Sequence, residues 1–193
     1  MRISFPEDEA RLPWLSLLLD YYSEFDDAVE RAIKISHKEI ACTKGCGACC
    51  RTHKDIPTYP HELVGITWYC VEKLKDPLRA EVIERLSKHE KGQCPFLIEN
   101  SCSIHPLRPA ACRAMNVSGT KCSEGEDAYH TRRQDVIAPS REDMDMALSI
   151  ILPFYGIDEY DIPEAIERGF ITTQITILNE CNWQGLAKKM RGQ

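Results

Sequence analysis

Apolar residues recur every three or four positions over long parts of the chain, which is the period of an amphipathic α-helix. The first such block runs from about Leu12 to Ile35 and predicts one or two helices that cover the core. Its apolar positions are Leu15, Leu18, Leu19, Tyr22, Phe25, Val29, Ala32 and Ile33. The N-terminal part of the protein is therefore expected to be helical.

Two further helices are predicted between residues 60 and 86. Pro60 suits the first turn of a helix, and Asp76 with Pro77 restarts the chain for a second one. The first helix is expected to bury a face made of Leu63, Val64, Thr67, Cys70, Val71 and Leu74, and the second to bury Leu78, Val82, Ile83 and Leu86. Cys70 therefore falls among core positions.

The C-terminal third also follows helical signals. Ser140 and Asp143 resemble a capped helix start, and the buried face of that helix is expected to carry Met144, Ala147, Leu148 and Ile151. Pro163 begins a short helix that Gly169 can close. The segment FITTQITIL at 170–178 is rich in β-branched residues, which suit a strand. We expect a helix there, because an isolated strand would lack a pairing partner.

The stretch from about Lys91 to Pro139 is expected to be irregular, because prolines and glycines interrupt every short pattern in it. A chain of 193 residues is long enough to bury one core. We therefore predict a mainly α fold: a single helical domain over residues 1–193 with an irregular, cysteine-rich, metal-binding loop region. The cysteine-cluster core of that domain spans residues 42–122, and metal is expected to keep its loops ordered.

Eight of the ten cysteines fall in two groups. The first group is Cys42, Cys46, Cys49 and Cys50, and the second is Cys94, Cys102, Cys112 and Cys122. A tetrahedral zinc or an iron–sulfur cluster takes about four thiolates, so the eight provide ligands for two sites. The other two, Cys70 and Cys181, are interpreted as structural, because free cysteines are commonly buried.

Within the first group, three sulfurs can converge on one point. Cys42, Cys46 and Cys49 are separated by three and two residues, and a compact turn or a helix start can direct them to a common centre. Gly45 and Gly47 flank Cys46, and glycine permits positive φ and close approach of the backbone. Cys50 adjoins Cys49 and cannot easily point the same way. A second metal, a bridge between two metals and a free thiol all stay open for it.

The surroundings of the cysteines favour metal over disulfides. The N-terminus lacks the apolar core of a secretory signal, and the longest apolar stretch, 147–157, falls short of the roughly 18 residues that span a bilayer. We therefore expect a cytoplasmic protein without membrane association, in a compartment that disfavours structural disulfides. The net charge of −6 argues against general binding to nucleic acids. Arg108 and Arg113 bracket Cys112 and are expected to favour its thiolate.

The motifs together resemble a known family. CTKGCGACC, the segment Cys94-Pro95-Phe96-Leu97, Cys102 with Ile104, and Arg108-Pro109 leading to Cys112-Arg113 are similar to the CxxCxxCC family of zinc- or iron-chelating proteins, also described as YkgJ-type cysteine cluster proteins. The resemblance covers about residues 42–122, and Cys122 is its weakest match. It implies metal chelation and does not identify a reaction. His105 stands where many relatives carry an aromatic residue, so the resemblance gives it no ligand role.

The expected cofactor is an iron–sulfur cluster or a zinc ion, since thiolates suit both. We favour a cluster for at least one site, because of the Cys94-Pro95 step, the glycines beside Cys46 and the irregular loop. Eight thiols already suffice for two sites, so His53 and His105, the histidines nearest to cysteines, are not expected to be ligands. The spacing of Cys42, Cys46 and Cys49 also matches radical S-adenosylmethionine enzymes, but their typical full barrel has about 250 residues.

Three functional classes stay open. The first is a metal-binding module with a structural, electron-transfer or metal-handling role. The second is a metal- or cluster-dependent enzyme, such as a relative of protein lysine methylases, although the chain has no G-x-G-x-x-G loop and no complete catalytic set. The third is a metal-braced module that binds a protein partner. Metal ions are the partners that all three classes share.

Overall fold

Helices supply most of the regular structure in the computed structural model, which describes residues 2–43, 45–90 and 92–192. The α-helices are α1 (Pro6–Arg11), α2 (Pro13–Ser36), α3 (Ala48–Thr52), α4 (Pro60–Trp68), α5 (Leu78–Ser87), α6 (Ala110–Arg113), α7 (Ala128–Thr131), α8 (Arg141–Ile151), α9 (Ile162–Glu167) and α10 (Trp183–Met190). A π-helix, Tyr69–Lys73, continues α4. The predicted mainly α fold is confirmed.

The strands are short and pair only two at a time. β1 (Pro57–Thr58) pairs with β6 (Thr176–Ile177), β2 (Leu97–Ile98) with β3 (Ser101–Cys102), and β4 (Asn116–Val117) with β5 (Val136–Ile137), all antiparallel. Of the six strands in the part of the chain that the structure describes, four lie between residues 92 and 139, joined by turns and very short helices. The predicted irregular character of that stretch is therefore confirmed. No helix among the described residues is long and apolar enough to cross a membrane.

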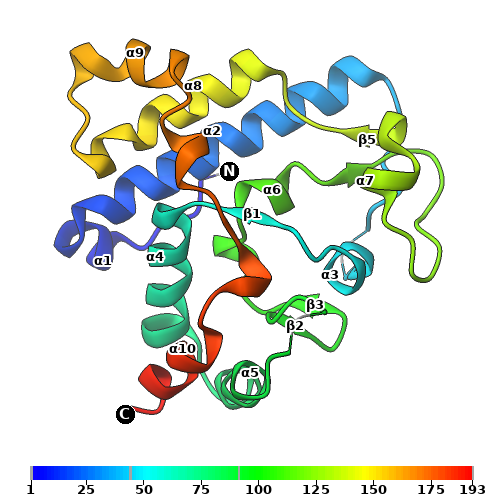
Figure 1. Ribbon diagram of the computed structural model, residues 1–193, viewed down its shortest axis with the longest axis vertical. Helices are drawn as coiled ribbons and strands as arrows, with labels where there is room; N and C mark the ends of the chain where they lie inside the picture. The colour runs from blue at the N-terminus through cyan, green and yellow to red at the C-terminus, as the bar shows by residue number, and fades with distance from the viewer. Residues whose placement is uncertain (1, 44, 91, 193) are drawn as a thin grey trace.

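The long helix α2 forms one side of the first hydrophobic core, as its apolar period predicts. Leu15, Leu18 and Leu19 are almost fully buried. Figure 1 shows α8 running alongside α2, with α9 beyond it. Ala147 and Ile151 of α8 complete the contact, and Ser140 caps α8 by accepting a hydrogen bond from the backbone N–H of Asp143. The predicted capped start of α8 is confirmed.

The helix α4 buries a different face from the one its apolar residues predict. His61, Glu62 and Gly65 are buried, whereas Val64 is 40% exposed. The reason is the close approach of α2: a Cβ atom on Gly65 would lie only 2.3 Å from Leu18 Cδ2. Ile66 and Trp68 are buried with Gly65, so the buried face is still partly apolar, but the close approach of α2 at Gly65 sets its direction. The expectation for Val64 was wrong.

A second core lies between α5, α10 and the π-helix. Figure 1 shows α5 and α10 together at one end of the molecule. Val82 and Leu86 of α5 are fully buried, as predicted, and Trp183 of α10 packs edge-on against Phe96 with ring centroids 4.8 Å apart. Cys70 is also fully buried in this core. Phe96 belongs to the cysteine-rich region, so this core is the surface on which that region rests.

The segment 170–178 is not the helix that we expected. Residues Ile171–Gln174 form a short 3-10 helix, and Thr176–Ile177 form strand β6. The partner that seemed to be lacking is β1, about 120 residues earlier in the chain, with Thr58 opposite Thr176. A pairing over such a separation has no local signature, and the β-branched residues were the better guide.

Gly65→Ala is expected to lower the free energy of unfolding by about 1–3 kcal/mol, because the added methyl overpacks a core site against Leu18. The better helix propensity of alanine offsets up to about 1 kcal/mol of this loss. The control is Val64→Ala on the exposed side of the same helix, expected to change stability by about 0.5 kcal/mol or less. Denaturant titration of both variants measures the difference. Equal stability of wild type and Gly65→Ala would contradict the close contact.

Candidate metal centre

The eight predicted ligands are all free thiols, and the fold divides them differently from their order in the sequence. Cys49, Cys50, Cys94, Cys102 and Cys112 act on one another electrostatically and form what we call the interior group. Cys42, Cys46 and Cys122 line one pocket and form what we call the pocket group. Each group combines cysteines from both halves of the motif.

The interior group begins at α3. Cys49 and Cys50 are hydrogen-bonded through their side chains, and Cys50 is hydrogen-bonded to the thiol of Cys94. The backbone supports this arrangement, because the N–H of Cys94 donates to the carbonyl oxygen of Cys50 over 2.8 Å. Cys94 is only 5% exposed and packs in the second core. Cys94, the first cysteine of the second sequence group, is therefore held next to Cys50, the last cysteine of the first sequence group.

The hairpin β2–β3 brings Cys102 to the same place. Its turn residues Glu99 and Asn100 both have positive φ, the conformation of the tightest two-residue hairpin turns. The turn lies against α3: Arg51 Nη1 donates to Asn100 Oδ1 over 2.8 Å, and a Cβ atom on Gly47 would lie 2.9 Å from the Asn100 carbonyl oxygen. The backbone of the hairpin turn therefore approaches Gly47 too closely for a side chain there. This is one of the two reasons for which a glycine was expected beside Cys46.

The short helix α6 carries Cys112 and is held at its first turn by a buried acid. Glu62, fully buried in α4, accepts a hydrogen bond from the N–H of Ala110 over 2.7 Å and a second from the N–H of Tyr59 over 3.0 Å. Two helix starts thus share one carboxylate, which satisfies backbone donors that helices leave unpaired. This contact sets the position of Cys112.

Arg113 anchors the other end of α6 to α2. Its side chain is 3% exposed, and Nη1 lies 2.6 Å from Asp26 Oδ2. The guanidinium also lies over the Tyr22 ring, 4.0 Å from the centroid, and donates to the carbonyl oxygens of Pro106 and Arg108. Arg113 is thus a buried clamp on the loop before Cys112.

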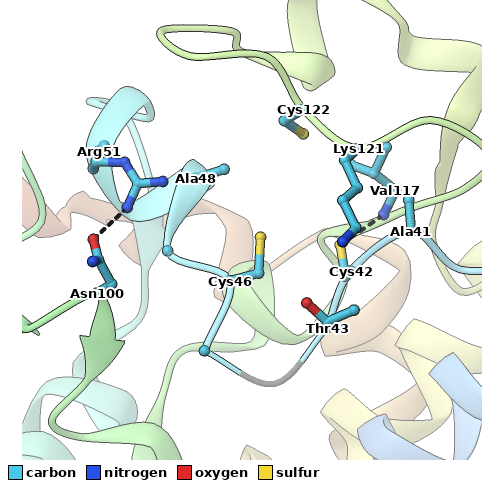
Figure 2. A pocket seen from close by; sticks show the side chains of 12 residues that line it. Ala41, Cys42, Thr43, Cys46, Ala48, Arg51, Asn100, Val117, Lys121 and Cys122 are labelled. Carbon is cyan, nitrogen blue, oxygen red and sulfur yellow. Dashed lines mark hydrogen bonds between the residues drawn. The ribbon is translucent and has the colours of Figure 1, made fainter.

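The pocket group is assembled by two backbone segments that run side by side. The N–H of Ala41 donates to the carbonyl oxygen of Val117 over 2.8 Å, and the N–H of Val117 points back to Cys42 Sγ at 3.4 Å. Figure 2 shows Cys42 and Cys46 projecting towards the side where Cys122 lies. The pocket has a volume of about 310 Å³, and Cys46 is exposed to solvent.

Cys49 lies where the two groups meet. It acts electrostatically on Cys42 of the pocket group as well as on Cys102 and Cys112 of the interior group. Cys49 therefore lies near Cys42, as the predicted convergence of Cys42, Cys46 and Cys49 requires, but it also lies near the interior thiols. The largest influence on the pKa of the Cys49 thiol comes from Cys50, so we assign Cys49 to the interior group.

Six of the eight thiols are held in the neutral form when no cation is nearby. Burial raises the pKa of Cys42, Cys102, Cys112 and Cys122. The hydrogen bond with Cys50 is the main cause of a raised pKa at Cys49. The same bond lowers the pKa of Cys50, but the hydrogen bond with Cys94 and burial outweigh it and bring that pKa to about 12. A bound cation reverses this preference, because positive charge stabilises thiolates.

The donor set suits a thiophilic metal, although its sulfurs do not converge on one point. Among the described residues, no three His, Cys, Asp or Glu side chains are already arranged to hold a metal ion. Neutral thiols attract one another weakly, since a thiol is a poor hydrogen-bond donor. Thiol ligands lose their protons when a metal binds, so each coordinating sulfur becomes negatively charged. Thiolate-rich sets of this kind select zinc or iron–sulfur clusters.

A comparison with protein families decides the affiliation. The family model "CxxCxxCC: Putative zinc- or iron-chelating domain" matches residues 41–138, which is half of the chain. The chain belongs to the CxxCxxCC family. The match begins one residue before Cys42 and extends past Cys122, so all eight cysteines lie inside the CxxCxxCC region. Comparisons with curated proteins and with solved structures give no match.

The remaining sequence candidates lie outside the two groups. Cys70 is buried in the second core and Cys181 packs at its edge. His53 Nε2 lies 2.8 Å from Asp127 Oδ1, and His105 contacts the guanidinium of Arg108. The residue that sequence reasoning missed is Glu62. Its only sequence signal is an acid in the first turn of a helix that begins with proline, which normally indicates a surface residue.

Glu62 and its neighbour His61 are expected to have opposite effects on stability as pH changes. Burial raises the pKa of Glu62 from 4.5 to about 7, so between these values the folded chain holds a proton that the unfolded chain lacks, and stability falls as pH rises. Burial lowers the pKa of His61 from 6.5 to about 3, so between these values stability rises with pH. From pH 4.5 to 6.5 the two contributions oppose each other.

Glu62→Gln should therefore expose the effect of His61. Relative to wild type, its free energy of unfolding should rise with pH between 4.5 and 6.5, by up to about 1.4 kcal/mol per pH unit. His61→Phe should show the opposite slope. Denaturant titrations at several pH values measure the slopes, and each slope is independent of the constant cost of the substitution. Parallel pH profiles of wild type and Glu62→Gln would contradict the raised pKa of Glu62.

Proposed function

We propose that this member of the CxxCxxCC family binds metal through both groups of thiolates, and that the interior group holds a structural centre. The observation that carries the proposal is the interior group itself. Its five cysteines come from α3, the segment before the hairpin, β3 and α6, and four of them, Cys50, Cys94, Cys102 and Cys112, pack in or against the second core. Membership of a family described as zinc- or iron-chelating supports a metal-binding role for these thiols.

The interior group lies where the fold most needs a crosslink. The hairpin β2–β3 has two residues in each strand, and α6 has four residues in all. Elements this short are marginal on their own, and a structural metal supplies folding free energy directly. A centre bound to Cys50, Cys94, Cys102 and Cys112 would join α3, the hairpin and α6 in one unit. We propose that residues 1–193 form a single domain around it.

The metal can be zinc or iron, because a thiolate set suits a Zn²⁺ ion and an iron–sulfur cluster equally. Free thiols are the form required for either, and we place the protein in the reducing cytoplasm. Anaerobic purification with elemental analysis, acid-labile sulfide determination and a visible spectrum decides between them. Zinc without sulfide assigns zinc sites, and iron with sulfide assigns a cluster. A folded protein that binds neither metal after reconstitution would refute the proposal.

The structural role predicts a difference between two buried cysteines. Cys94→Ala should lose metal from the interior group and lower stability by more than the roughly 1–2 kcal/mol of a lost buried sulfur. Cys70→Ala is the matched control, because Cys70 is buried in the same core and belongs to neither group. It should lose stability but no metal. Metal content per chain and thermal unfolding provide the two readouts.

Measurements with a chelator separate the two causes of the stability loss in Cys94→Ala, which are the lost metal and the lost packing of the sulfur. With metal removed from all proteins, Cys94→Ala and Cys70→Ala should destabilise the fold by similar amounts. If Cys94→Ala kept its full metal content, the interior group would not be a metal centre. If the stability difference persisted in chelator, Cys94 would act through packing alone.

A further inference from the structure

A pocket outside the cysteine region lies where α2, α4, the π-helix and α10 come together. It has a volume of about 440 Å³, within the roughly 300–1,000 Å³ that is typical of small-molecule sites. No cysteine is among the described residues that line it, so the proposed metal binding does not account for this pocket.

The wall of the pocket is mainly apolar. Trp14, Leu63, Val64, Trp68 and Val71 supply it. Trp14 packs against the first core, whereas Leu63 and Val71 pack against the second, so the pocket lies where the two cores adjoin. The 40% exposure of Val64, which the helical period did not predict, is exposure at this pocket. An apolar group bound here would remove these side chains from water, which favours binding.

The π-helix forms one side of the pocket. Val71 and Glu72 belong to it, and both line the pocket. The π-helix follows directly on α4, so the chain leaves α-helical geometry at the point where it reaches the pocket. A π-helical turn is rare in proteins and is frequently found at functional sites. The backbone therefore supports a binding role independently of the apolar wall.

Two opposite charges border the apolar wall. Glu72 comes from the π-helix and Lys189 from α10. Within residues 2–43, 45–90 and 92–192, neither side chain forms an ion pair or a side-chain hydrogen bond, whereas the neighbouring Lys73 is paired with Asp8. A ligand with one ammonium and one carboxylate group complements both charges, and its apolar part suits the wall between them.

We infer that this pocket binds a small zwitterion with an apolar side chain, of the class of free amino acids such as leucine. The apolar side chain lies against Trp14, Val64 and Val71, the ammonium group near Glu72 and the carboxylate near Lys189. This inference goes beyond the proposed function and does not depend on it, because the pocket and the thiols share no residue.

The intrinsic fluorescence of the full chain tests the inference. Two of its three tryptophans, Trp14 and Trp68, line the pocket, whereas Trp183 lies in the second core. The probes are leucine, isoamylamine, which lacks the carboxylate, and isocaproate, which lacks the ammonium group. We expect a saturable fluorescence change with leucine. Each analogue should bind about threefold more weakly, because it loses one exposed ion pair.

Three variants assign the contacts. Glu72→Gln should bind leucine and isocaproate equally, and Lys189→Gln should bind leucine and isoamylamine equally. Val64→Phe should weaken leucine binding, because the larger side chain occupies the pocket, and its exposed position should leave the fold intact. The matched control is Lys188→Gln, which should bind leucine like wild type, because Lys188 is exposed on the same helix and does not line the pocket.

The outcomes separate this inference from the proposed function. A wild-type chain that shows no saturable response to leucine would overturn the inference and leave the metal-binding proposal intact. Equal affinity of wild type for the three probes would overturn the assignment of a zwitterion. A leucine response that Val64→Phe keeps in full would place the binding elsewhere and overturn the site. Failure to bind metal would refute the proposed function alone.

Discussion

The buried carboxylate of Glu62 is the contact on which the geometry of the cysteine region depends. It joins the first turn of α4 to the first turn of α6 through two backbone hydrogen bonds. Unpaired N–H groups at helix starts favour the charged carboxylate, while complete burial favours the neutral acid, and the balance leaves its pKa at about 7. Because α6 has only four residues, it has little means of holding its own position. Cys112 therefore faces the other interior thiols only while Glu62 and the Arg113 clamp hold α6 in place.

The two groups of thiols lie in different physical environments, and this difference bears on what each can do. Most of the interior group packs against the second core, near Phe96 and Trp183, where Cys94 is buried and Cys50, Cys102 and Cys112 are partly buried. The pocket group borders a smaller cluster around Val117, Ala128 and Val136 and is open to solvent. A metal site that exchanges a ligand must be reachable from solvent, whereas a structural metal site is fully coordinated by protein ligands. Thiols of one family motif thus lie in both a closed and an open environment.

Local patterns predicted the helices well and the tertiary contacts poorly. The period of α2 and the cap of α8 depend on neighbouring residues, so the sequence was a sufficient guide to both. The buried face of α4 depends on how closely α2 approaches Gly65, and strand β6 depends on a partner near residue 57. Neither contact leaves a periodic signal. The arrangement of the cysteines in space is also a tertiary property, because order along the chain says little about which loops return to α3.

The start of α3 explains how one short motif can supply two groups. The helix begins at Ala48, after Cys46, so Cys46 lies in the preceding loop while Cys49 and Cys50 lie on the helix. Consecutive helical residues point about 100° apart, so two adjacent thiols on α3 cannot aim at one ion in the same way. Cys50 faces Cys94, and Cys49 is left at the boundary, within electrostatic reach of both groups. One short motif thus supplies thiols to both groups, with Cys49 between them.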